Sequence, residues 1–140
     1  MKFSHGMKKI LPKNEVSVLV LRLGLGIVFL VFGIGKFRGD EWAQTMQNMA
    51  FFSYLPWSVN ASIALAGAAE IITGCCLIAG LFLCFFSWIA ACQIVAILIL
   101  LFVQDIVEIR DFGLLAMAVA LALSPPDRLS LDHWRKHFLS

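Results

Sequence analysis

Apolar residues form long runs along this chain, and short polar segments separate them. The first run, from Val16 to Gly35, reads VSVLVLRLGLGIVFLVFGIG and is interrupted only by Arg22. A helix of about 20 apolar residues matches the hydrocarbon thickness of a bilayer. The run therefore predicts a transmembrane helix over about residues 16–37.

A cleaved signal peptide is the competing interpretation of this first run, because lysines precede it as in a positive n-region. Its apolar region would be too long, however, and no small-x-small cleavage site precedes Lys36 and Arg38. We therefore expect the first helix to remain in the mature protein.

The longest weakly polar run extends from Val59 to Val103. As a single helix it would be roughly 65 Å long, far more than one crossing needs. We expect a helical hairpin with spans of about 59–79 and 82–103 and a turn near Ala79-Gly80, because glycine readily caps a helix C-terminus. The preceding segment 38–58 mixes charged, amide and aromatic residues, which is typical of an interfacial loop or short helix.

The last apolar run, Phe112 to Leu123, would cover only about 18 Å and cannot cross alone. It is either a re-entrant segment or the end of a helix that begins near Ile106 and carries charged residues into the outer bilayer. We favour the helix, over about 106–123, because irregular backbone at membrane depth needs protein or water to satisfy it. Pro125-Pro126 then ends it.

The composition agrees with a membrane protein, since 61% of the residues are hydrophobic and 14% charged, against about 45–50% and 25% in soluble domains. We predict an all-α integral membrane four-helix bundle. Its spans lie within residues 16–123, between a basic N-terminal segment, 1–15, and an interfacial tail, 124–140. The basic residues concentrate at the two termini, which predicts that both termini are cytoplasmic. They form no stripe of the kind that binds nucleic acid.

Ionisable side chains inside the predicted spans are the candidate functional residues, because burying a charge in lipid costs free energy. Counting along the helices places Arg22 roughly 9 Å above the cytoplasmic boundary, Glu70 near the midplane and Arg110 roughly 20 Å up. We expect one polar centre shared by all four helices, with Lys36 at its outer mouth. The expected pocket residues are Arg22, Lys36, Glu70, Gln93, Arg110 and Asp111. The alternative is a buried ion-pair lock that only fixes helix packing.

Small residues on the polar faces of the first two spans predict close helix packing. The packing positions are Gly26, Gly33, Gly67 and Gly74.

Cysteine and histidine offer little further chemistry. Cys75, Cys76, Cys84 and Cys92 contain no C-x-x-C motif and fit small residues of the bundle better than a redox centre. The histidines, His5, His133 and His137, all lie in the tails, so we expect no metal site.

Four motifs occur in order along the chain: RLGLGIVFLVFGIGKF, GAAEIITGCCLIAGLF, RDFGLLAMAVALAL and RLSLD. Together, over about residues 20 to 132, they resemble the DoxX-like family of small membrane proteins. The resemblance implies a four-helix bundle in a prokaryotic cytoplasmic (inner) membrane. The matching positions are Arg22, Gly33, Lys36, Phe37, Glu70, Gly74, Arg110, Asp111, Gly113, Ser130 and Asp132. Two departures are Leu81–Cys84, where the family has a polar or basic residue, and Ser124–Pro126, where it has Gly-Pro-Gly.

The family takes its name from a small subunit of a thiosulfate:quinone oxidoreductase, and other members are associated with redox or thiol stress. The resemblance therefore implies a membrane subunit or accessory protein of a quinone- or thiol-linked redox system. No cofactor is expected to be intrinsic, and a bound quinone is the candidate. The expected partners are the lipid bilayer and either a redox protein or a second copy of this chain. The alternative is a non-enzymatic bundle that binds or moves a small lipid-soluble molecule or scaffolds a complex, since the chain has no self-contained catalytic motif.

Overall fold

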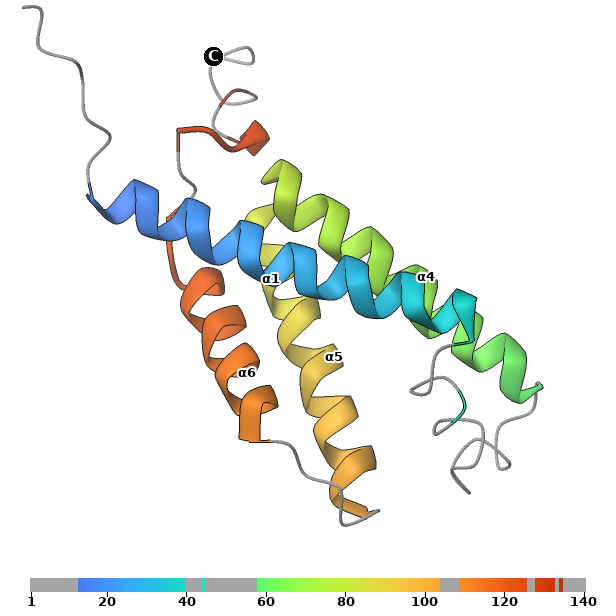
Figure 1. Ribbon diagram of the computed structural model, residues 1–140. Helices are drawn as coiled ribbons and strands as arrows, with labels where there is room; N and C mark the ends of the chain where they lie inside the picture. The colour runs from blue at the N-terminus through green and yellow to red at the C-terminus, as the bar shows by residue number, and fades with distance from the viewer. Residues whose placement is uncertain are drawn as a thin grey trace, which may run out of the picture.

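The computed structural model describes residues 13–39, 44, 58–103, 109–125, 128–132 and 134. The main elements of this part of the chain are the helices α1 (Lys13–Arg38), α4 (Val59–Ala79), α5 (Leu83–Val103) and α6 (Ile109–Ala122), shown in Figure 1. The predicted all-α, four-helix fold is therefore confirmed. Most of the predicted interfacial segment 38–58 and of the terminal segments 1–15 and 124–140 lies outside the described residues.

The helices are arranged as two pairs. Helix α1 packs mainly along α4, and α5 packs mainly along α6. Figure 1 shows the pairs meeting near the α4–α5 turn and diverging toward the end where α1 finishes and α6 begins. We call these the closed end and the open end of the bundle.

The contact between α1 and α4 is built on glycine. A Cβ added at Gly33 would lie 2.8 Å from the carbonyl oxygen of Gly67, and one added at Gly74 would lie 2.8 Å from that of Gly26. No larger residue fits there unless the two backbones separate. The seven-residue spacing on each helix keeps both contacts on one face. The four glycines predicted as packing positions thus all lie at this contact.

Large apolar side chains face away from the bundle. The exposed fraction reaches 74% for Phe102, 74% for Leu123 and 64% for Val31. An apolar surface of this kind is more favourable in contact with lipid than with water. Three helical segments, Glu15–Arg38, Val59–Ala79 and Leu83–Phe102, are long and apolar enough to cross a membrane.

Helix α6 is shorter than the predicted span of 106–123. It covers Ile109–Ala122, 14 residues, or about 21 Å against a hydrocarbon core of about 30 Å. The predicted start near Ile106 lies outside the described residues. The crossing-capable helices among the described residues thus fall one short of four, and the fourth crossing stays a prediction.

The C-terminal segment 128–132 holds the α4–α5 turn at the closed end. Gly80 has a φ of 67° and caps α4 at the predicted position, while Phe82 has a φ of 47°, which a bulky side chain rarely adopts. The Asp132 carboxylate accepts hydrogen bonds from the backbone N–H of Phe82 at 2.9 Å and of Leu83 at 2.8 Å. The Asp132 N–H in turn donates to the Gly80 carbonyl at 3.1 Å. These bonds cap α5 and offset the strain of the turn.

The beginning of α1 lies at the same closed end, because Glu15 Oε1 is 3.1 Å from Arg128 Nε. Both ends of the described chain therefore lie on one side of the bundle. This agrees with an even number of crossings, whereas the side of the membrane stays a prediction.

Replacing Gly33 by alanine is expected to destabilise the bundle by roughly 1–3 kcal/mol, because the added methyl group forces α1 away from α4. Thermal unfolding in detergent micelles, followed by circular dichroism, measures the effect. Gly113→Ala is the matched control, since a Cβ there meets no heavy atom within 4 Å, and it should leave stability unchanged or raise it by up to about 1 kcal/mol, because alanine favours the helix. Equal losses in both variants would contradict the close contact.

Candidate functional site

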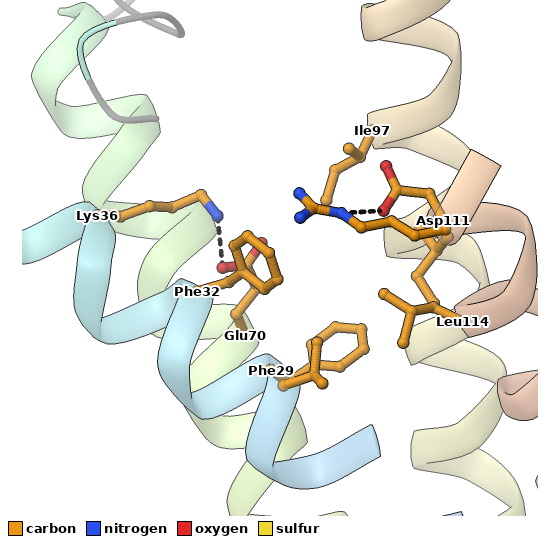
Figure 2. A pocket seen from close by; sticks show the side chains of 10 residues that line it. Phe29, Phe32, Lys36, Glu70, Ile97, Asp111 and Leu114 are labelled. Atoms are coloured by element: carbon orange, nitrogen blue, oxygen red, sulfur yellow. Dashed lines mark hydrogen bonds and ion pairs between the residues drawn. The ribbon is translucent and has the colours of Figure 1, made fainter. Parts of the chain in front are cut away.

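A pocket lies between the two helix pairs toward the open end, and Figure 2 shows its side chains facing one another from opposite walls. Its volume is about 50 Å³, and its walls are mostly apolar. The lining residues are Val28, Phe29, Phe32 and Lys36 of α1, Glu70 of α4, Ile94 and Ile97 of α5, and Arg110, Asp111 and Leu114 of α6.

One wall carries an ion pair between α1 and α4. The Lys36 Nζ donates to Glu70 Oε2 at 2.5 Å, and the two side chains are 5% and 6% exposed. Gly67 allows the Lys36 stem to pack closely against α4, because a Cβ at position 67 would lie 3.2 Å from Lys36 Cβ. In such surroundings each charge depends on the other, since an unpaired buried ion is costly.

The facing wall carries a second, looser pair within α6. The Arg110 Nε is 3.6 Å from Asp111 Oδ1, and the side chains are 53% and 10% exposed. The Arg110 guanidinium carbon also lies 5.6 Å from the centroid of the Phe32 ring, within the range of a cation–π contact. Arg110 therefore reaches from α6 to α1, and the formal charges of the two ion pairs sum to zero.

The structure brings four of the six predicted pocket residues together, Lys36, Glu70, Arg110 and Asp111, and places Arg22 and Gln93 elsewhere. Arg22 does not line this pocket: it is buried at the closed end, where its Nη2 donates to the Leu129 carbonyl at 3.2 Å. The glycine contacts set a register in which Glu70 lies opposite Leu30. Arg22 is eight residues away from Leu30, or roughly 12 Å along the helix, and it faces the Gly80 turn instead.

The other predicted pocket residues also take positions of their own. Gln93 donates through Nε2 to Thr73 Oγ1 at 3.2 Å, rather than to Glu70, and does not line the pocket. Lys36, expected at the outer mouth, lies inside the bundle as the partner of Glu70, whereas Arg110 is the more exposed cation. Asp111 lines the pocket as expected from its place beside Arg110.

The aromatic wall of the pocket, formed by Phe29 and Phe32, was not among the predicted pocket residues. Phe29 and Phe32 lie seven and four residues before Lys36, so all three share one face of α1. That spacing is the signal that could have identified them. In an apolar span it is weak, because phenylalanine also faces lipid.

Other candidate chemistry lies away from the pocket. The four cysteines are free thiols, and Cys75, Cys84 and Cys92 are exposed on the outside of the bundle. Within the described ranges, no three His, Cys, Asp or Glu side chains come together in a way that could hold a metal ion.

Comparison with known proteins identifies the family. The DoxX family model matches residues 17–103, which is more than half of the chain. The chain belongs to the DoxX family. With three helices able to cross a bilayer, it is a DoxX membrane protein. The match includes Lys36 and Glu70 and ends before Arg110, so the α6 wall of the pocket lies outside it. No curated protein and no solved structure gave a match.

The Lys36→Met variant of this DoxX protein is expected to lose roughly 3–5 kcal/mol of stability, because Glu70 would remain as an uncompensated buried charge. The double variant Lys36→Met, Glu70→Met should recover most of the loss, since it removes both charges. Thermal unfolding of the single and double variants in micelles measures the coupling. Additive losses would show that the two side chains do not depend on each other.

Proposed function

We propose that this DoxX protein binds a small lipid-soluble molecule with polar oxygen atoms in the pocket, as a subunit or accessory protein of a quinone- or thiol-linked redox system. The observation that carries the proposal is the placing of two ion pairs in an otherwise apolar pocket between membrane helices. Charged groups at membrane depth are costly and commonly mark ligand or proton sites.

The donor set fits a quinone. The rings of Phe29 and Phe32 offer an apolar surface for a planar ring. Lys36 and Arg110 offer hydrogen-bond donors for carbonyl oxygens. A quinone, when bound, supplies the two-electron chemistry that the chain's own residues lack. Glu70 can hold or release a proton at its carboxylate oxygen.

The charge balance of the pocket favours a neutral ligand. Lys36 and Arg110 are already matched by Glu70 and Asp111. An added charged group would lack a partner in an apolar site, and this is unfavourable. A neutral ring compound therefore fits better than a small anion.

A carrier for a small lipid-soluble molecule is the second candidate. The observation that favours it is the position of the pocket between two helix pairs that diverge toward the open end. A carrier would move its ligand across the membrane of a vesicle without any redox reaction. A redox subunit would instead support electron transfer with a partner protein.

Saturable binding of a short-chain ubiquinone to the protein in micelles, measured by calorimetry, tests the proposal. Phe29→Ala and Glu70→Gln should each raise Kd about tenfold, equivalent to about 1.4 kcal/mol. Arg128→Gln, at the closed end, should leave Kd unchanged. Wild-type protein that binds no quinone would overturn the quinone site.

We also propose that both termini face the cytoplasm of a prokaryotic cell, because they carry most of the basic residues. Green fluorescent protein fused to either end should then fluoresce, and alkaline phosphatase fused there should be inactive. Active phosphatase at both ends would reverse the orientation.

A further inference from the structure

The size of the pocket sets a condition on any ring-shaped ligand. The pocket measures about 50 Å³, whereas an engineered cavity of about 150 Å³ in another protein holds one benzene ring. The pocket as it stands therefore has room for water but not for a quinone ring. A side chain at its mouth must move before such a ligand can bind.

Arg110 is the side chain placed at that mouth. It is 53% exposed, whereas Lys36, Glu70 and Asp111 have exposed fractions of 5%, 6% and 10%. Of the four charged groups in the pocket it is thus the most exposed, and the other three are almost fully buried.

The contacts of Arg110 connect the two helix pairs across the pocket. Its ion pair with Asp111 stays within α6, while its cation–π contact with Phe32 reaches α1. The 3.6 Å separation from Asp111 exceeds that of a strong charge-assisted hydrogen bond. Half-exposed ion pairs and cation–π contacts are individually weak, so neither of these two contacts by itself fixes the position of the side chain.

The two ends of the bundle differ in the contacts that hold them together. At the closed end, the buried Asp132 side chain caps α5 through two backbone N–H groups. At the open end, a half-exposed arginine lies over an aromatic ring. Movement that admits a ligand is therefore easiest at the open end.

We propose that Arg110, held over Phe32, is the gate of the pocket and that its displacement admits the ligand between α1 and α6. The gate rests on the proposed function only in taking this pocket as the ligand site. The side chain closes the pocket over Lys36 and Glu70 in the resting state, and the size of the opening selects what enters.

Chemical labelling of Glu70 tests the gate without any ligand. Dicyclohexylcarbodiimide reacts with buried carboxyl groups of membrane proteins, and peptide mass spectrometry measures the rate at Glu70. If the open state is populated at about 10%, Arg110→Ala should raise that rate about tenfold. Phe32→Ala keeps every charge and should raise it in the same direction. Arg128→Ala is the matched control, because Arg128 is 51% exposed and paired with Glu15 outside the pocket.

A second reagent separates opening from a change in charge. Removing Arg110 also changes the electrostatics at Glu70, which would accelerate small and large carbodiimides equally. Loss of a gate should accelerate dicyclohexylcarbodiimide more than the smaller diisopropylcarbodiimide. Equal acceleration of both reagents, an unchanged rate in Arg110→Ala, or no label at Glu70 in any variant would overturn the gate.

The outcomes for the gate and for the quinone site are distinguishable. Faster labelling together with no quinone binding keeps the gate and rejects the quinone. Quinone binding together with unchanged labelling keeps the site and rejects the gate.

Discussion

The close contact of α1 with α4 is the constraint on which the rest of the structure depends. Four glycines let the two backbones approach so closely that a single added Cβ would clash with the opposite helix. The same contact leaves room beside Gly67 for the stem of Lys36, and the ammonium group then meets Glu70. The buried ion pair is thus a consequence of backbone packing, and it forms one wall of the pocket.

The bundle is asymmetric along its length: hydrogen bonds hold the closed end together, and a charged pocket lies toward the open end. At the closed end, Asp132 binds the C-terminal segment to the α4–α5 turn, and Arg22 binds the same segment to α1. At the open end, the pairs diverge and a pocket with four charged groups lies between them. A bundle fixed at one end can vary its opening at the other while its core remains packed.

The helices, the Gly80 turn and the packing glycines follow from local signals in the sequence, because apolar run length and glycine spacing directly reflect bilayer thickness and helix contact. The partners of the buried charges do not follow from such local signals. Arg22 and Lys36 are 14 residues apart and lie on one face of α1, so the helix face alone could not decide which of them meets Glu70. The Asp132 cap joins residues 49 positions apart, and no local pattern specifies such a distant bond. The pocket wall was missed because its phenylalanines resemble lipid-facing residues.

The proposed pocket between the helix pairs holds a small molecule in the membrane. Native mass spectrometry of the protein extracted gently from its own membrane tests this most directly. We expect a quinone-sized adduct on the wild-type protein that is lost in Glu70→Gln and retained in Arg128→Gln. A protein that carries only ordinary lipids, equally in all three forms, would contradict this expectation and leave the two ion pairs as a packing lock.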